Sequence, residues 1–287
     1  MRQPGAIFSI QSSVAYGHVG NSAAVFPLQR LGFEVWPVNT VYFSNHTGYG
    51  AWRGSVLELE TLREVVLGIE ERGVFGDCGG VLSGYLGDAS LGHLVLEILE
   101  RVRAVNPNVV YCCDPVMGDV GRGFFVRPGI PEFMRSSAVP AATIVTPNQF
   151  ELEYLAGMPV TDLASALRAV ETVQALGPDI VLLTSFVRTD GEPGTIELLA
   201  ADRNAAYLVT TPKLDLKVNG AGDATAAIFF GQWIRSKQIE VALNRTTNAI
   251  FGILSLTHAT GSREIQLIAA QDAIANPPNA FQAVRIR

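Results

Sequence analysis

Lysine is the scarcest charged residue in this chain, which contains only Lys213, Lys217 and Lys237 among its 287 residues. A nucleotide-binding loop of the form G-x-x-x-x-G-K-S/T requires a lysine directly after its second glycine, and none of the three stands in such a loop. The net charge of −6 also argues against a nucleic-acid surface, because phosphate binding needs clustered Lys and Arg. We therefore expect neither a lysine-based phosphate loop nor a nucleic-acid partner.

Cysteine, histidine and long apolar runs are also sparse. The three cysteines, two of them adjacent as Cys112 and Cys113, offer no disulfide framework, so we expect a reducing cytoplasm. The four histidines are scattered, which makes a zinc site unexpected. No apolar segment reaches the length of a membrane span without polar interruption, and AIFSI at residues 6–10 is too short for a signal peptide. The sequence thus predicts a cytoplasmic protein without a membrane partner.

Apolar residues are plentiful, at 48% of the chain, and short apolar runs alternate with helical patterns. We expect strands at residues 6–10, 33–41, 80–84, 108–115, 143–147 and 179–185. We expect helices at residues 21–32, 56–72, 91–105, 148–157 and 161–177, after the stretch 217–231, from about 241, and near 265–274, with Pro27 marking a kink or a helix start. Such alternation predicts one α/β domain over residues 1–287, with a mostly parallel central sheet and helices on both faces. The adjacent β-rich runs 194–202 and 205–213 predict an antiparallel edge.

The stretch KVNGAGDATAAIFFG at residues 217–231 places two glycines and an aspartate before an apolar helix. Gly220 and Gly222 would let the backbone approach a ligand, and the unpaired amides of the helix start suit an anion such as a transferring phosphate. Asp223 in the first turn could take a proton from an attacking hydroxyl. The alternative is an ordinary glycine turn with Asp223 as a capping residue.

Two further stretches place carboxylates at strand ends. In TPNQFELE (146–153), Asn148 and Glu151 have the spacing of a capping pair, or of an amide and a carboxylate near a hydrated Mg²⁺. In CCDPVMGDVGRG (112–123), Asp114 ends a strand and Asp119 follows in a glycine-rich loop. Asp114 needs a cation or another partner if it is buried, whereas a plain turn is the alternative for this loop.

The segments SIQSSVAYGHVGN (9–21) and NTVYFSNHTGYG (39–50) put hydroxyl, histidine and aromatic residues at strand ends. Ser12, Phe43, His46 and Thr47 could together line a pocket for a small, flat, polar ring. Taken one at a time, each is compatible with ordinary loop chemistry.

In this order on an α/β chain, these motifs resemble the ribokinase-like superfamily and its pyridoxal kinase (vitamin B6 kinase) branch. The resemblance covers nearly the whole chain, and the branch-level match is carried by IQSSVAYGHVGNSAA, VNTVYFSNHTGYG, VLSGYLG and DPVMGD. It implies ATP-dependent phosphorylation of the 5′-hydroxymethyl group of pyridoxal, with pyridoxine and pyridoxamine as further acceptors. It also implies Mg²⁺, a monovalent cation (K⁺ or Na⁺) beside it, and a homodimer.

The resemblance also implies roles for individual residues. Asp223 would be the base, and the backbone amides of Gly220, Ala221 and Gly222 would hold the γ-phosphate. Around the vitamin ring, the implied residues are Ser12 on the ring-nitrogen side, Thr47 and His46 at the polar substituents, and Phe43 and Tyr85 as aromatic walls. Around the triphosphate and its cations they are Asp114, Asp119, Thr146, Glu151 and Thr184; of these, Asp114, Asp119, Thr146 and Glu151 are the expected metal-site residues. Beside the adenine they are Thr211, Pro212, Lys213 and Leu214.

Two positions depart from the pattern of the branch. Asn219 precedes G-A-G-D, as in sugar kinases of the superfamily, whereas the branch usually has G-T-G-D or G-V-G-D. Thr184 stands where some bacterial members carry a lysine that could reach phosphate. Arg122, in the glycine-rich loop, is our hypothesis for a replacement cation.

Three other functions are compatible with parts of the sequence. A hydroxymethylpyrimidine kinase would also accept a flat heteroaromatic ring bearing CH₂OH. A sugar kinase is disfavoured, because carboxylates for grasping sugar hydroxyls are not evident near the N-terminus. A non-catalytic protein that stores pyridoxal phosphate would need a lysine for a Schiff base, and the intact Asp223 with its glycine loop favours the enzyme.

Overall fold

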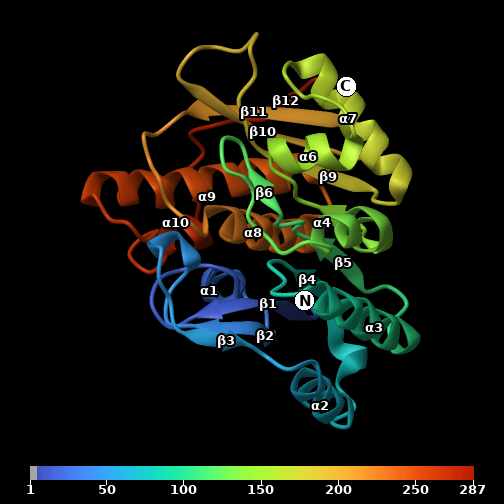
Figure 1. Ribbon diagram of the computed structural model, residues 1–287. Helices are drawn as coiled ribbons and strands as arrows, with labels where there is room; N and C mark the ends of the chain where they lie inside the picture. The colour runs from blue at the N-terminus through green and yellow to red at the C-terminus, as the bar shows by residue number, and fades with distance from the viewer. Residues whose placement is uncertain (1–4) are drawn as a thin grey trace.

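A ten-stranded sheet forms the centre of the computed structural model, which describes residues 5–287 (Figure 1). The strand order is β12-β11-β10-β9-β8-β5-β4-β1-β2-β3. The strands are β1 (Ala6–Val14), β2 (Val35–Phe43), β3 (Gly54–Val56), β4 (Cys78–Ser83), β5 (Val110–Cys113), β8 (Ile144–Val145), β9 (Ile180–Phe186), β10 (Thr195–Ala201), β11 (Ala206–Pro212) and β12 (Val284–Arg285). A separate two-stranded ribbon joins β6 (Gly118–Asp119) and β7 (Gly123–Phe124).

The middle of the sheet is parallel and its edges are antiparallel. The pairs β2–β1, β1–β4, β4–β5, β5–β8 and β8–β9 are parallel. The pairs β9–β10, β10–β11 and β11–β12 are antiparallel, which confirms the expected antiparallel edge at residues 194–213. The short strand β3 pairs antiparallel with β2 at the other edge, which the sequence did not predict.

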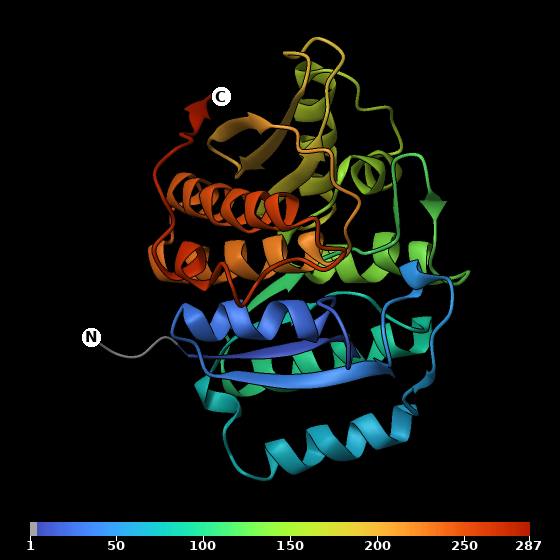
Figure 2. The same ribbon diagram turned by 90° about the vertical axis from the view of Figure 1, so that its left-hand side faces the viewer.

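Helices cover both faces of the sheet, as Figure 2 shows edge-on. The core on one face includes residues of α1 (Asn21–Arg30), α8 (Ala221–Ser236), α9 (Ile239–Thr260) and α10 (Gln271–Ala275). The core on the other face includes residues of α2 (Leu59–Glu70), α3 (Ala89–Val105), α4 (Ile130–Phe133), α5 (Val139–Ala141), α6 (Gln149–Ala156) and α7 (Leu163–Leu176). Because both faces are covered, β1 is apolar on both sides: Ile7 packs into one core, and Phe8 and Ile10 into the other.

Two sequence expectations were wrong in detail, and of the two alternatives for Pro27 the helix start is excluded. Pro27 lies inside α1 and is buried there, so core packing outweighs its lost hydrogen bond and it starts no helix. The helix expected at 56–72 begins at Leu59, because Gly54–Val56 pairs with β2. The helix expected near 265–274 is reduced to α10, since Ile265 and Leu267 are buried by core contacts within a turn.

The parallel strands β1, β2, β4, β5, β8 and β9 all end at the same edge of the sheet, which is where ligands bind in open α/β folds. The loops after these strands carry most of the motifs found in the sequence. Within residues 5–287, no helix is both long enough and apolar enough to cross a membrane. The three cysteines are free and buried.

Candidate active site

A cavity of about 280 Å³ lies at the carboxyl ends of the parallel strands, beside the start of α8. It brings together every residue that the sequence assigned to the vitamin ring, the transferring phosphate and the cations. These are Ser12, Phe43, His46, Thr47, Tyr85, Asp114, Asp119, Thr146, Glu151, Thr184, Gly220, Ala221, Gly222 and Asp223. We call this space the acceptor cavity. Segments as far apart in the chain as Ser12 and Asp223 thus meet around one space.

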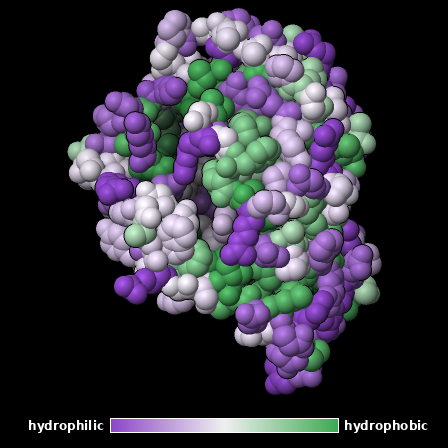
Figure 3. All heavy atoms as spheres, in the orientation of Figure 1, coloured by the Kyte–Doolittle hydropathy of each residue, from purple (hydrophilic) through white to green (hydrophobic). Residues whose placement is uncertain are grey.

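A second cavity of about 250 Å³ adjoins the first, and we call it the nucleotide cavity. Its wall contains all four residues expected beside the adenine: Thr211, Pro212, Lys213 and Leu214. Apolar residues of β10 and α9 form much of the remainder, among them Ile196, Leu198, Ile250, Phe251 and Leu254. In Figure 3 a hollow with a hydrophobic floor opens above α9. The two cavities share Thr184, Ser185, Val218, Ala221 and Gly222, so one elongated ligand can occupy both.

Glycine stands at positions 220 and 222, at the start of α8, for different structural reasons. Gly220 has φ of 86°, and a Cβ at this position would lie 1.7 Å from the backbone oxygen of His18, so only glycine fits. Gly222 has ordinary helical geometry, and a Cβ there would meet no heavy atom within 4 Å. The fold therefore requires Gly220, whereas Gly222 leaves open space where the two cavities meet. No side chain caps this end of α8, which leaves its first amides available to an anion.

Asp223 lies in the first turn of α8, at the wall of the acceptor cavity. Burial raises the pKa of this carboxyl to about 6, against a smaller lowering by the backbone amides of Gly20 and of Asp223 itself. The side chain is only partly accessible, and the access it has is to the cavity. A carboxyl with a pKa near neutrality is matched to accepting a proton from a hydroxyl and releasing it afterwards.

Glu151 is a capping residue, as one of the two sequence interpretations held. Asn148 accepts from the Glu151 amide at 3.0 Å, and Glu151 Oε2 accepts from the Asn148 amide at 2.9 Å, which completes a capping box on α6. The other oxygen, Oε1, accepts from the amide of Met117 at 2.8 Å and more weakly from Gly118. Glu151 therefore fixes the 117–118 backbone against α6, and both of its oxygens are already engaged.

Asp114 is a buried carboxylate with one neutral partner. Thr146 Oγ1 donates to its Oδ1 at 3.0 Å, and no other hydrogen bond to its side chain is seen within residues 5–287. Burial, together with the nearby Glu151 and Asp223, raises the pKa of Asp114 well above its usual value. Burial also raises the pKa of Glu151, although backbone amides oppose the shift. Such a concentration of buried acid is stabilised when a cation approaches.

The oxygen donors around Asp114 fit Mg²⁺ rather than a softer metal, because Mg²⁺ takes hard oxygen ligands and keeps several waters. In the described part of the chain, no three His, Cys, Asp or Glu side chains converge closely enough to hold an ion by themselves. A divalent ion here would accordingly share few protein oxygens and take the rest from water and phosphate.

Arg122, the proposed replacement for the missing lysine, lines the acceptor cavity between β6 and β7. Its guanidinium carbon stands 5.2 Å from the centre of the Phe125 ring. Lys213 lines the nucleotide cavity, so one of the three lysines does lie near the expected nucleotide. The hypothesis for Arg122 is compatible with this position.

Sequence reasoning missed several cavity residues. Val19, Ser185, Val218 and Asn219 line the acceptor cavity, and Ser185 has φ of 53° although it is not glycine. A positive φ in a non-glycine residue carries strain and gathers at functional sites, but the sequence TSF gives no signal of it. Val19 lies in the same motif as Ser12, and Asn219 directly precedes Gly220. This closeness in sequence to expected site residues could have indicated both.

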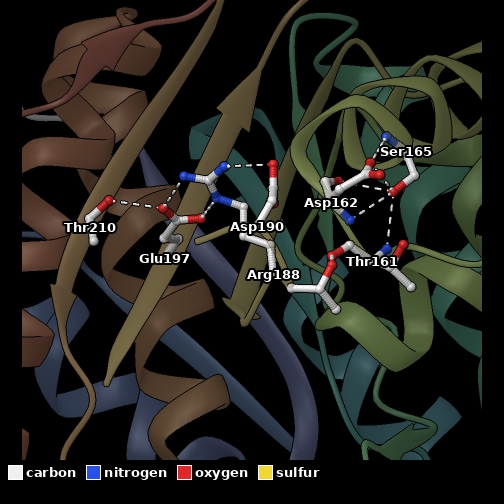
Figure 4. Close-up of polar contacts among 8 residues, drawn as sticks. Thr161, Asp162, Ser165, Arg188, Asp190, Glu197 and Thr210 are labelled. Carbon is white, nitrogen blue, oxygen red and sulfur yellow. Dashed lines mark hydrogen bonds and ion pairs between the residues drawn. The ribbon is translucent and has the colours of Figure 1, made fainter. Parts of the chain in front are cut away.

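A polar network supports the strands beside the nucleotide cavity (Figure 4). Arg188, in the loop after β9, donates to Glu197 on β10 through Nε at 2.7 Å and through a second nitrogen at 3.1 Å. Thr210 on β11 donates to the same carboxylate at 3.0 Å. Glu197 is 3% exposed, so this is a buried ion pair with every oxygen engaged. It ties the loop that follows Ser185 to the antiparallel edge of the sheet.

Comparisons with known proteins show which family the chain resembles. The family described as phosphomethylpyrimidine kinase matches residues 72–266. A pyridoxal kinase PdxY from Rubrobacter xylanophilus is 62% identical over 281 residues, covering 98% of this chain and 97% of that protein. One from Deinococcus radiodurans is 53% identical over 289 residues. The solved pyridoxal kinase from Leishmania donovani in complex with ADP and pyridoxamine superposes with a TM-score of 0.92 at 29% identity, covering 99% of this chain and 100% of that one.

Proposed function

The chain belongs to the pyridoxal kinases of the ribokinase-like superfamily, and we propose from its own geometry how it transfers the γ-phosphoryl group of ATP to the 5′-hydroxymethyl of a B6 vitamer. One observation carries the proposal: Asp223 and the uncapped start of α8 stand where the acceptor cavity meets the nucleotide cavity. ATP lies with its base in the nucleotide cavity and its phosphates toward Gly222. The vitamer lies in the acceptor cavity with its hydroxymethyl at Asp223.

The residues then have defined tasks. Asp223 accepts the proton of the attacking hydroxyl, and the amides of Ala221 and Gly222 stabilise the charge on the transferring phosphoryl group. The positive end of the α8 dipole acts on the same atoms. Phe43 and Tyr85 bound the ring, while Ser12, His46 and Thr47 offer it polar contacts. These assignments rest on the position of each residue in the cavity wall.

Asp114, Asp119, Thr146 and Glu151 are the residues that would hold Mg²⁺, with Glu151 acting through water because amides occupy its oxygens. When bound, Mg²⁺ neutralises charge on the β- and γ-phosphates. A monovalent cation, K⁺ or Na⁺, is proposed beside it at the same buried acids. Thr184 borders both cavities and Arg122 lines the acceptor cavity, where its positive charge takes the place of the lysine that the family resemblance gives some members at position 184. An Arg122→Ala variant with an unchanged KM for ATP would remove that last role.

The stored-vitamin alternative is weakened by the cavity itself. No lysine lines the acceptor cavity within the described chain, so a Schiff base with the aldehyde has no amine there. The hydroxymethylpyrimidine alternative keeps one supporting observation, because the matching family is described as phosphomethylpyrimidine kinase. The full-length relatives are pyridoxal kinases, so we rank the vitamer first.

The test is ADP release from Mg·ATP by purified protein with pyridoxal, pyridoxine, pyridoxamine, hydroxymethylpyrimidine and ribose offered separately. We expect turnover with a B6 vitamer, and its loss in Asp223→Asn. Turnover confined to the pyrimidine or to ribose would reject the acceptor assignment while keeping the phosphoryl chemistry. Pyridoxal binding without turnover on any acceptor would favour the storage protein.

Two further properties are part of the proposal. Homodimerisation is inferred from the family resemblance, and a cytoplasmic location is inferred from the cysteine content. Sedimentation or light scattering of the purified chain checks the first, and fractionation of the source cells checks the second.

A further inference from the structure

Glu264 is a buried carboxylate that belongs to none of the sequence motifs. It lies between α9 and α10, is 8% exposed, and accepts three hydrogen bonds. Oε2 accepts from the amide of His18 at 3.0 Å. Oε1 accepts from Tyr49 Oη at 2.7 Å and is 3.0 Å from His46 Nε2. One side chain thus gathers donors from the loop after β1 and from the loop after β2.

The backbone around Glu264 also reaches the start of α8. Glu264 pairs with Asn219 in an isolated parallel bridge, directly before Gly220. On the other side, the carbonyl of His18 is packed so closely on Gly220 that no Cβ fits there. Glu264, the His18 segment and the anion-binding helix start therefore form one packed unit.

His46 is the member of this group that lines the acceptor cavity. A carboxylate oxygen only accepts, so the bond to Glu264 places a hydrogen on Nε2 and, in a neutral ring, leaves Nδ1 as an acceptor. Nδ1 is buried and has no hydrogen-bond partner among residues 5–287. It lies 2.9 Å from the point where a Cβ on Gly48 would stand, and the side-chain nitrogen Nδ2 of Asn219 lies 2.7 Å from that point. Nδ1 is thus closed off from a ligand as well as from water, and Glu264 is the one hydrogen-bond partner that the ring has among residues 5–287.

We propose that Glu264 is a positioning residue: its bond to Nε2 fixes the His46 ring in the wall of the acceptor cavity, so that His46 bounds the space that receives the ring of the acceptor substrate. Through the amide of His18, it also holds the loop after β1 against the start of α8. The proposal rests on the function given above and adds a residue outside the cavity wall that sets the position of one inside it. Tyr49 supports the same carboxylate, and Arg263 stacks on the Tyr49 ring at 4.4 Å.

The first test is Glu264→Gln. Glutamine offers one acceptor oxygen where glutamate offers two, so at least one of the three donors loses its partner. We expect the vitamer KM to rise about tenfold, the size of one lost hydrogen bond to a charged group. The ATP KM should stay within about twofold, because Glu264 contacts no residue of the nucleotide cavity. An unchanged vitamer KM in folded Glu264→Gln would overturn the proposal.

A double-mutant cycle shows whether Glu264 acts through His46. In a His46→Ala background, Glu264→Gln should add no further rise in vitamer KM, because the shared interaction is already gone. Fully additive effects would overturn the proposal. Should Glu264→Gln fail to fold, His46→Ala alone decides, since a wild-type vitamer KM there would also overturn it.

Glu197→Gln is the matched control, because Glu197 is also a buried glutamate bonded by several donors (Figure 4). Glu197→Gln should lower the melting temperature and leave the vitamer KM unchanged. An equal rise in vitamer KM in Glu197→Gln and Glu264→Gln would mean a general loss of packing, and it would overturn the proposal. Wild-type turnover is the reference throughout. Failure of the proposed function appears as no vitamer turnover in wild type, whereas failure of this inference appears only in the variants.

Discussion

The two adjoining cavities share one wall and differ in chemistry. The acceptor cavity contains Asp114, Asp119, Glu151 and Asp223. Asp114 and Glu151 are buried, and burial raises the pKa of both carboxyls. The nucleotide cavity is lined by aliphatic and aromatic side chains, threonines and Lys213. Reacting groups need charge and donors in a place shielded from water, whereas a nucleotide base needs only a flat apolar slot. Changes at the acids of the first cavity should therefore alter kcat, changes at its ring-facing residues should alter the KM for the vitamer, and changes in the second cavity should alter the KM for ATP.

Asp223→Asn should lower activity more than any other change in the acceptor cavity. Asparagine keeps the shape but cannot accept the proton, so kcat should fall at least about a hundredfold. The KM for ATP should remain near the wild-type value, since the nucleotide cavity is untouched. Single-turnover kinetics with a B6 vitamer check both statements, and near-wild-type turnover would remove Asp223 from the mechanism.

Alanine substitutions at the two glycines of the α8 start should have different effects, one on catalysis and the other on folding stability. Gly222→Ala places a methyl group in open space between the cavities, so the protein should fold normally and kcat/KM should fall at least about tenfold. Gly220→Ala meets the His18 carbonyl at a positive φ, so its melting temperature should drop by about 5 °C or more. Calorimetry with activity measurements distinguishes them, and full activity in Gly222→Ala would contradict an anion site at that position.

The pH profile should reflect the raised pKa of Asp223. A base must be ionised, so kcat/KM should fall about tenfold for each pH unit below a pH of about 6. The sign for stability is opposite: a carboxyl whose folded pKa is raised stabilises the fold at acid pH and loses that contribution as pH rises through 6. Ligand-free Asp223→Asn should then melt higher than wild type at neutral pH, and equal melting at all pH values would argue against a raised pKa.

Leu254→Ala probes the nucleotide cavity alone. Removing part of an apolar wall on α9 should raise the ATP KM about fivefold, in line with the area it contributes. Turnover at saturating ATP and the vitamer KM should not change. Initial-rate kinetics with both substrates varied provide the check, and a selective loss of kcat would mean that the two cavities do not divide the work in this way.

Glu151→Gln should have the smallest effect on activity. Glutamine retains an oxygen for capping but lowers the negative charge near Asp114, so a few-fold higher Mg²⁺ concentration should be needed for half-maximal rate. A magnesium titration at fixed ATP measures this, with the melting temperature as the control for α6. An unchanged titration would confine Glu151 to its capping role.

Much of the architecture followed from periodicity. The alternation of apolar runs and amphipathic helices predicted a mostly parallel sheet covered on both faces, and the two β-rich runs before residue 213 predicted its antiparallel edge. Strand β3 was missed because three residues carry no period, and the helix near 265–274 was overestimated because core contacts bury Ile265 and Leu267 in a turn. Short elements are decided by their partners rather than by their own sequence.

By itself, the sequence determined the residues that can do chemistry: Asp223 after its glycines, the carboxylates at strand ends, and the aromatic and hydroxyl residues in the first fifty positions. Only the tertiary structure decided which of the two glycines is required by packing. It also decided that both carboxylate oxygens of Glu151 accept hydrogen bonds from backbone amides, and that Glu264 accepts hydrogen bonds from two loops far away in the chain. The physical reason is that residue type and local period fix chemistry and secondary structure, whereas hydrogen bonds over long sequence separations exist only after the strands have assembled.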